Sequence, residues 1–251
     1  MIRFFALTRR EVSRFVKIKG QTIGAPLLET FLYISVFGAA LGTRVGDLDG
    51  VDYVVYVIPG LILMAWAINA FTNNASSLLQ QKFQRSIDDQ LSSPATPIQL
   101  LLAFTLGGFL RGMTIAIITF LVASVLVDLP VEHPVVLVIS LFLVGFFFSQ
   151  LGVLVGIRAE QFDDVSFAQT FILQPLIFLG GIFYSASLLP EPYQTLTHFN
   201  PVYYMISTVR YGFLGQQDVN ITLSLIGLTI ATGALFLANH RLFVSGYKLR
   251  T

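Results

Sequence analysis

The sequence predicts an all-α, polytopic membrane protein with six transmembrane helices, an N-terminal amphipathic interfacial helix and an outer re-entrant helix pair before the last span. Three observations predict this fold: an apolar composition, six long apolar stretches and an uneven distribution of Lys and Arg. Hydrophobic residues make up 55% of the 251 residues and charged residues only 12%, against about 25% charged in soluble domains. A globule of this size in water would still need a polar surface, so lipid must surround much of the chain.

The overall charge and the absence of cysteine exclude several functions. The net charge is +1 and there are no cysteines, so a generally basic nucleic-acid binder, a thiolate metal site and a cysteine nucleophile are not expected. We find no internal repeat or linker, and therefore predict a single domain over 1–251. Cations interrupt the first 20 residues, so we expect no cleavable signal peptide.

The first 20 residues mix apolar side chains with six cations, in a roughly two-faced pattern on a helix. Such a segment is typical of an interfacial helix, with apolar residues at the acyl boundary and cations against anionic lipid headgroups. The alternative is a positively charged flank with no other role. The polar candidates on this helix are Arg9, Arg10, Glu11 and Arg14.

Six stretches are long and apolar enough to cross about 30 Å of hydrocarbon. They are Thr22–Thr43, Tyr53–Thr72, Leu100–Val127, Pro134–Ile157, Phe167–Ser187 and Ile221–His240.

The orientation follows from the positions of Lys and Arg. With the N-terminus inside, twelve of the 15 basic residues fall on the cytoplasmic side, Arg44 and Arg210 fall outside, and Arg111 lies within a span. Both termini are therefore expected in the cytoplasm.

The segment 76–99 is the longest cytoplasmic loop. Its apolar residues Phe83, Ile87 and Leu91 repeat at helical spacing, which predicts one short two-faced helix over Gln80–Leu91 before Pro94 and Pro97 end it. This helix is a candidate docking element for a soluble partner. A helix that rests on the membrane surface explains the same periodicity.

The outer segment 188–215 is too apolar and aromatic for a solvated loop. Pro190 and Pro192 suit the first turn of a helix, Asn200–Pro201 breaks it, and Gly215 can end a second helix. Two short helices around a proline break predict a re-entrant pair that dips into the outer leaflet.

Two intramembrane charges, Glu29 and Arg111, are expected at similar depth in the inner leaflet. They can pair, line a substrate path or a water-filled cavity, or have a purely structural role, with Arg111 reaching the inner headgroups. On the cytoplasmic side, Asp163 or Asp164 can cap the helix of the fifth span, and contact with a cytosolic partner is a further possibility.

Catalytic motifs are absent from the sequence. It has no GxxxxGK[ST] phosphate loop, no HExxH and no GxSxG. A membrane-integral enzyme is therefore disfavoured, although it stays an alternative. A second alternative is a non-transporting sensor or assembly subunit that couples an ATPase to another membrane protein.

Several segments together resemble the permeases of the ABC-2 type transporter family. They are IPGLILM (58–64), SSLLQQKFQRSIDDQLSSPATP (76–97), FDDVS (162–166), LGGIFYSASLLP (179–190) and HFNPVYYMISTVRYGFLG (198–215). The resemblance implies an exporter of the bacterial inner membrane in which two copies of the permease form the path. Two copies of a P-loop ATPase dock below and bind ATP and Mg, so this chain would hold no cofactor and no metal.

The resemblance also implies roles for particular residues. The ATPase-coupling contacts would fall on Lys82, Phe83, Gln84, Arg85, Ser86, Ile87, Asp88, Asp89 and Leu91. The outer gate would include Asn200, Pro201, Tyr204 and Arg210. Membrane lipids are further partners. Apolar walls with few charges favour an amphipathic or hydrophobic cargo over a small ion.

Overall fold

The computed structural model describes residues 2–17, 20, 24–36, 42, 46–48 and 50–249, and most of these are helical. The only strand pairing in these ranges is a small antiparallel hairpin in which Leu48 pairs with Val51. The elements are α1 (Ile2–Lys17), α2 (Ala25–Val36), β1 (Asp47–Leu48), β2 (Val51–Asp52), α4 (Tyr53–Phe83), α5 (Ser86–Leu91), α6 (Pro97–Leu126), α7 (Pro134–Arg158), α8 (Phe162–Phe167), η3 (Ala168–Leu173), α9 (Gln174–Phe178), η4 (Ala186–Leu188), α10 (Glu191–Phe199), α11 (Pro201–Leu214) and α12 (Ile221–Ser245).

Four of the described helices are long and apolar enough to cross a membrane: α4, α6, α7 and α12. They correspond to four of the six predicted spans, so the all-helical membrane fold is confirmed at this level. The first predicted span, Thr22–Thr43, contains the shorter apolar helix α2, and most of its remaining residues lie outside the described ranges.

The fifth predicted span, Phe167–Ser187, is displaced in the structure. Helix starts five residues earlier, at Phe162, and continues through α8, η3 and α9 to Phe178. The early start follows from Asp164, whose carboxylate accepts hydrogen bonds from the backbone N–H groups of Glu160 and Gln161. The early end follows from a turn in which Gly181 has φ +83°, a conformation that favours glycine.

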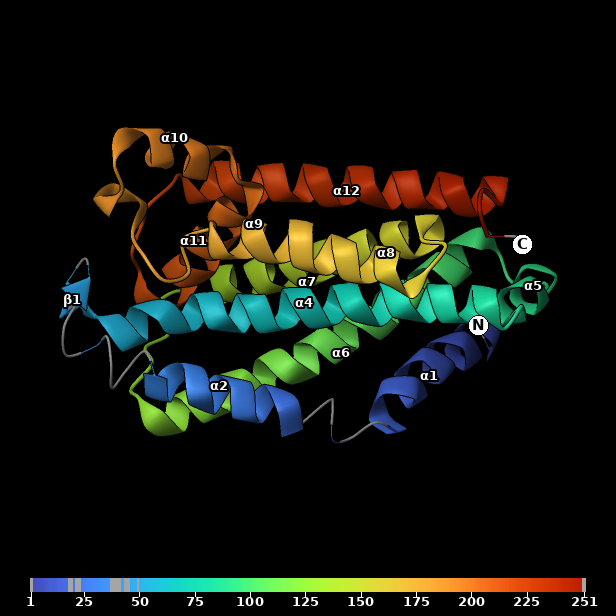
Figure 1. Cartoon of the computed structure of the whole chain (residues 1–251), viewed down its shortest axis with the longest axis horizontal. Coiled ribbons are helices and arrows are strands. Elements are labelled where there is room, and N and C mark those ends of the chain that lie inside the picture. The colour runs from blue at the N-terminus through green and yellow to red at the C-terminus, as the bar shows by residue number, and fades with distance from the viewer. Residues whose placement is uncertain are drawn as a thin grey trace.

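Helix α4 forms the centre of the bundle, with α6 and α7 packed along it (Figure 1). Of its most apolar stretch, 72% is buried within the protein, against 17% for α12. Helix α4 is therefore a core helix surrounded by protein, whereas α12 presents most of its apolar surface outward, as expected for a helix facing lipid.

Glycines allow α4 and α7 to pack closely. Gly145, Gly152 and Gly156 lie on the face of α7 that meets α4, and a Cβ at Gly152 would collide with the backbone of Phe71. Membrane helices associate through such small-residue contacts because lipid supplies no hydrophobic driving force between them. The indole of Trp66 fills the space left by Gly112 of α6 and Gly145 of α7.

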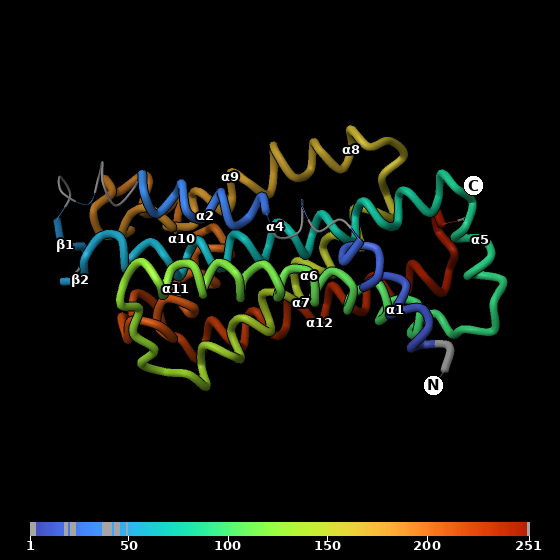
Figure 2. Tube along the Cα trace, turned by 90° about the horizontal axis from the view of Figure 1, so that it is seen from below, coloured from blue at the N-terminus to red at the C-terminus, as the bar shows by residue number. Residues whose placement is uncertain are grey.

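The two ends of the bundle differ. The start of α1, helix α5 and the end of α12 lie at one end, and the hairpin, α10 and α11 lie at the other (Figures 1 and 2). The outer segment forms two helices, α10 and α11, separated by Asn200. Gly215 ends α11 in the left-handed conformation at φ 70°, as the sequence predicts.

The glycine contact between α4 and α7 can be tested by adding a single methyl group. We expect Gly152→Ala to lower the free energy of unfolding by about 1–3 kcal/mol, because the backbone of Phe71 cannot give way. Thermal melting in a fixed detergent measures the effect. The matched control is Gly233→Ala in α12, where nothing lies within 4 Å of the added Cβ and we expect no loss. Equal melting temperatures for both variants would show that the close contact is not required.

Candidate functional site

The candidate site is the end of the bundle formed by α1, the last turns of α4, and α5. Helix α4 ends at Phe83, and Arg85 adopts a left-handed conformation (φ 54°) before α5 begins at Ser86. The prediction of one helix over Gln80–Leu91 is therefore wrong, because the chain turns at Gln84 and Arg85. The turn allows the apolar side chain of α5 to point back into the bundle.

The predicted apolar stripe is divided between two surfaces. Ile87 is completely buried in a cluster with Leu78, Leu100 and Leu101. Phe83 is 59% exposed and stacks on Phe162 of α8, with ring centroids 5.5 Å apart. Ile87 therefore anchors the loop, while Phe83 belongs to the outer surface.

Lys82 is also buried, although the sequence places it among the exposed contact residues. Its Nζ donates to the carbonyl oxygens of Ile157 at 2.9 Å and Ala159 at 2.6 Å. A cation at this position satisfies the free carbonyl groups at the C-terminus of α7. Lys82 thus fixes α4 to α7, and it is not available to a partner.

The residues that remain accessible define the docking surface. Phe83, Gln84, Arg85 and Asp89 are exposed, whereas Ser86, Asp88 and Leu91 are partly buried. This short segment projects at the extreme end of the bundle (Figure 2).

Glu11 of α1 is a buried carboxylate at the base of the docking surface, with 2% of its surface exposed. Its Oε1 accepts from Nη2 of Arg10 at 2.8 Å and from Nε2 of Gln81 at 3.0 Å. Its Oε2 accepts from Oγ of Ser77 at 2.6 Å. A buried charge is tolerated only when it is paired and hydrogen-bonded in this way.

Arg10 extends the same network to α5. Its Nη2 also donates to Oε1 of Gln81 at 2.8 Å and to Oε1 of Gln90 at 2.9 Å. Gln90 in turn donates from Nε2 to Oε1 of Gln81 at 2.6 Å. Helices α1, α4 and α5 are therefore joined by charge-assisted hydrogen bonds. The side chain of Arg10 is 42% exposed, and Arg9 is exposed as well.

Arg14 continues the polar contacts one turn further along α1. Its Nη2 donates to Oδ1 of Asn73 at 2.9 Å and also to the backbone carbonyl of Asn73. Burial lowers the pKa of Arg14, and the nearby carboxylate of Glu11 opposes that shift. Arg10 and Arg14 thus bind protein groups, in contrast to the expectation that the cations of this helix face lipid headgroups.

A line of buried polar side chains leads from Asn73 across the bundle to α12. Asn73 donates to Asn74 at 3.3 Å, and Asn74 donates to Oγ of Ser149 at 2.7 Å. Ser149 donates to the carbonyl of Thr105 at 2.6 Å, and Gln150 donates to Oγ1 of Thr105 at 2.8 Å. Asn239 then donates to Oε1 of Gln150 at 2.7 Å. We call these residues the polar seam. It connects α4, α7, α6 and α12, and the sequence analysis missed it. Its only sequence signal is the presence of amides and hydroxyls inside apolar stretches.

The acidic pair before the fifth predicted span has divided roles. Asp164 caps α8, as described above, while Asp163 is exposed. Beside them Lys248 donates from Nζ to Oε1 of Glu160 at 2.7 Å, which fixes the end of the chain to the α7–α8 turn. The hydrogen bond to Lys248 lowers the pKa of Glu160.

Glu29 and Arg111 do not form an ion pair in the structure. Glu29 lines a cavity of about 50 Å³ whose walls include Asn69 and Ile115. Arg111 lies one helical turn before Ile115 on α6, and within the described ranges it has no hydrogen bond to protein and no carboxylate in ion-pair contact.

Arg210 is the most buried charge at the opposite end, with 1% of its surface exposed. Its Nη2 donates to the carbonyl of Gly181 at 2.6 Å and its Nη1 to Oδ2 of Asp218 at 3.1 Å. Its guanidinium lies 3.9 Å from the ring centroid of Tyr56. One side chain therefore holds together α11, the turn after α9, the loop before α12, and α4.

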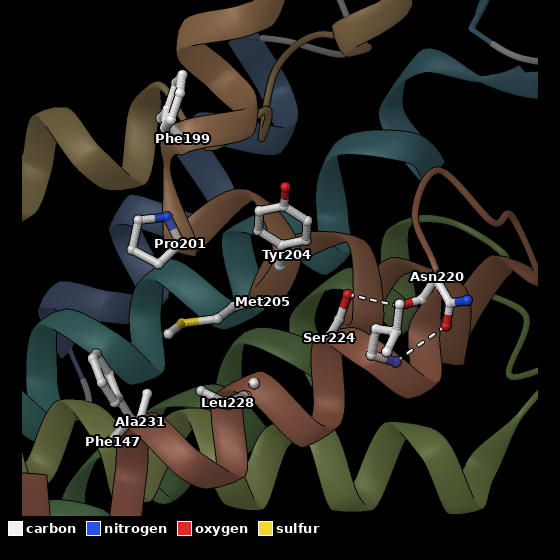
Figure 3. A pocket seen from close by; sticks show the side chains of 11 residues that line it. Phe147, Phe199, Pro201, Tyr204, Met205, Asn220, Ser224, Leu228 and Ala231 are labelled. Atoms are coloured by element: carbon white, nitrogen blue, oxygen red, sulfur yellow. Dashed lines mark hydrogen bonds between the residues drawn. The ribbon is translucent and has the colours of Figure 1, made fainter. Parts of the chain in front are cut away.

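The other outer candidates shape an apolar groove of about 430 Å³ between α10, α11 and α12 (Figure 3). Pro201 and Tyr204 line it, and the Tyr204 hydroxyl donates to the carbonyl of His198 at 3.0 Å. Asn200 caps α11 by accepting from the N–H of Val202 at 3.0 Å, and donates to the carbonyl of Leu176 at 2.6 Å. The polar groups here are occupied in positioning the helices.

No group of three or more His, Cys, Asp or Glu side chains arranged to hold a metal occurs in the described part of the chain.

Comparison with known proteins gives consistent matches over most of the chain. The profile of the ABC-2 type transporter family matches residues 2–214. The inner membrane transport permease YadH of Escherichia coli K12 is 38% identical over 242 residues, covering 96% of this chain and 94% of YadH. Nodulation protein J of Sinorhizobium fredii is 26% identical over 237 residues, covering 90% of this chain and 87% of that protein.

The buried carboxylate at the base of the docking surface provides a test of its structural role. Replacement of Glu11 by Ala leaves the hydroxyl of Ser77 without its acceptor and removes one of the two acceptors of Gln81 Nε2, so we expect a loss of about 1–3 kcal/mol in the free energy of unfolding. Detergent melting curves measure the loss. Arg9→Ala, an exposed position on the same helix, should change stability by less than about 0.5 kcal/mol. If Glu11→Ala and the wild type have the same melting temperature, the network does not hold α1 in place.

Proposed function

The chain belongs to the ABC-2 type transporter family, and from that premise we propose that it is the membrane-spanning subunit of an ATP-driven exporter. The resemblance to the ABC-2 permeases, and among them to the YadH-type inner-membrane permeases, is thereby confirmed. In the proposed assembly two copies of the chain form the substrate path, and each binds one copy of a separate P-loop ATPase.

The observation that carries this proposal is the docking surface. Four exposed side chains sit on a turn whose base is fixed by Lys82, Ile87 and the network around Glu11. An exposed segment held by a rigid base is suited to binding a soluble partner, because little conformational freedom is lost on docking.

The same contacts supply a route from the ATPase to the membrane. Movement of α5 is transferred to α1 and α4 through Arg10, Gln81 and Gln90. Coupling requires that the permease makes different contacts with two nucleotide states of its partner. We propose that closure of the ATPases shifts the docking surface, that the helices of the two subunits rearrange, and that cargo leaves between them.

The chemistry of ATP hydrolysis belongs to the partner in this proposal. ATP and Mg bind to the ATPase, since this sequence contains no phosphate loop. The full topology of six spans, with both termini in the cytoplasm and α10 and α11 re-entrant at the outer side, is part of the same proposal. It is supported by the position of α1, α5 and the end of α12 at one end of the bundle (Figure 1).

The cargo proposed is amphipathic. The outer groove is lined mainly by apolar side chains such as Met205 and Leu228, and charged residues are scarce throughout the chain. Such surroundings suit a molecule with a large apolar part and disfavour a small ion.

Arg85 allows the docking surface to be tested without loss of the fold. Arg85 has a positive φ of 54°, so Arg85→Gly relieves backbone strain while it removes the exposed guanidinium. We expect the variant to melt at or above the wild-type temperature. In co-purification from mild detergent, at least tenfold less ATPase should remain bound to the variant than to the wild type. The control is Arg241→Glu, which changes an exposed residue at the same end of the molecule. Glycine is not used at this position because the residue lies within α12. The control variant should retain the ATPase. Full retention by Arg85→Gly would exclude this turn from the contact.

The proposed orientation can be measured by cysteine labelling, because the natural chain contains no cysteine. Asp89→Cys lies on the docking surface, and Tyr193→Cys lies on α10, where the side chain is 61% exposed. In intact cells an impermeant maleimide should label Tyr193→Cys and leave Asp89→Cys unlabelled until the membrane is opened. The reverse pattern would invert the orientation and rule out docking of a cytoplasmic ATPase at α5.

A further inference from the structure

Arg14 and Arg111 meet where α1 packs against α6. A Cβ added at Gly107 of α6 would lie 2.6 Å from the Cβ of Glu11 of α1, so the two helices touch at that point. Both helices run in the same direction away from the α5 end (Figure 1). Arg14 lies three residues beyond Glu11, and Arg111 lies four residues beyond Gly107, so each is one turn further along. The helical register therefore places the two cations on neighbouring turns of helices in contact, where like charges repel.

These two cations are incompletely paired within the described ranges, since Arg14 shares the carboxylate of Glu11 with Arg10, and Arg111 has no carboxylate in ion-pair contact. The Nε atoms of both Arg14 and Arg111 are buried and have no hydrogen-bond partner. Arg14 is bound on one side only, by the carbonyl groups of Asn73. The nearest carboxylate, Glu11, already accepts three hydrogen bonds from Arg10, Gln81 and Ser77. Two arginines of α1 therefore share one carboxylate, Arg111 has none in ion-pair contact in the part of the chain that the structure describes, and an anion is missing.

The missing anion has to lie near the inner membrane surface of the proposed orientation. Arg111 lies fourteen residues, or about 21 Å, from the start of α6, a helix of 30 residues that is apolar enough to cross a membrane. At about 45 Å, α6 is about 15 Å longer than the hydrocarbon is thick, so Arg111 can lie about one turn below the inner headgroups. An unpaired charge at such a position costs from about 2.5 kcal/mol upward. Glu29 does not supply the charge, because it lines the separate cavity beside Ile115.

We propose that Arg14 and Arg111 together bind the phosphate group of an anionic phospholipid from the inner leaflet, where α1 packs against α6. A guanidinium can donate two parallel hydrogen bonds to phosphate oxygens, and the orphaned Nε–H groups are available donors. The exposed apolar side chains of the same helices, Val16 and Ile117, each 48% exposed, provide surface for the acyl chains. The lipid would complete the contact between α1 and α6 and so fix the helix that supports the docking surface. The site is separate from the proposed transport function.

The test is thermal melting of the purified full-length protein in neutral detergent during titration with phosphatidylglycerol. Within the described ranges Arg111 donates no hydrogen bond to the protein, so Arg111→Gln removes none there. We therefore expect it to melt, without lipid, at or above the wild-type temperature. Wild type should be stabilised by phosphatidylglycerol in a saturable manner, and half-saturation of Arg111→Gln should need at least tenfold more lipid, since hydrogen bonds to charged groups are lost. If Arg111→Gln cannot be purified, Arg111→Lys retains the charge without the planar fork and should weaken binding several-fold.

Two variants and two ligands serve as controls. Arg9→Gln removes an exposed arginine of α1, and Glu29→Gln removes the other intramembrane charge; both should bind phosphatidylglycerol as the wild type does. Phosphatidylcholine and inorganic phosphate should not give the saturable shift. The proposal is overturned if Arg111→Gln binds phosphatidylglycerol as tightly as wild type, or if it melts lower than wild type without lipid. It is also overturned if Glu29→Gln behaves as Arg111→Gln, or if inorganic phosphate acts as the lipid does.

Discussion

The buried carboxylate of Glu11 is the interaction on which the α5 end of the molecule depends. A charge with 2% exposure is stable only because three donors from α1 and α4 surround it. That requirement fixes the position of α1, and Arg10 passes the constraint to α5 through Gln90. The docking surface is therefore held by polar contacts, while Ile87 and Lys82 secure it from the other side. Apolar packing alone gives little orientation in a membrane, because lipid chains compete equally well for apolar surface.

The sequence predicted the elements whose signals are local. Long apolar stretches identified α4, α6, α7 and α12, and the Asn200–Pro201 break and Gly215 correctly delimited α10 and α11. Features that depend on distant contacts were not predictable. Periodicity placed Phe83 and Ile87 on one stripe, but the turn at Arg85 separates them, because Ile87 packs with residues of α6. Likewise, nothing in the sequence around Asn74 indicates that it meets Ser149, 75 residues away.

The contacts of the charged residues were also not predictable from the sequence. Arg210 reads as an outer-loop cation, yet it is fully buried and its charge is distributed over a carbonyl, a carboxylate and an aromatic ring. Lys82 reads as a contact residue, yet it caps α7. In both cases the side chain satisfies backbone carbonyls that no periodic pattern reveals. Arg111 is the exception, since the protein provides it with no partner within the described ranges.

The glycine contacts between α4 and α7 determine which parts of one subunit can move. If α7 slid by one helical turn, the larger side chain of Phe148 or Ser149, which precede Gly152 on the same face, would be brought against the backbone of Phe71, where Gly152 fits. Shear in that direction is sterically blocked, so α4 and α7 are expected to move together. Movement within the chain must then come from rotation of that pair of helices as a whole, or from α2 and the α8–η3–α9 segment, which contact α4 much less extensively.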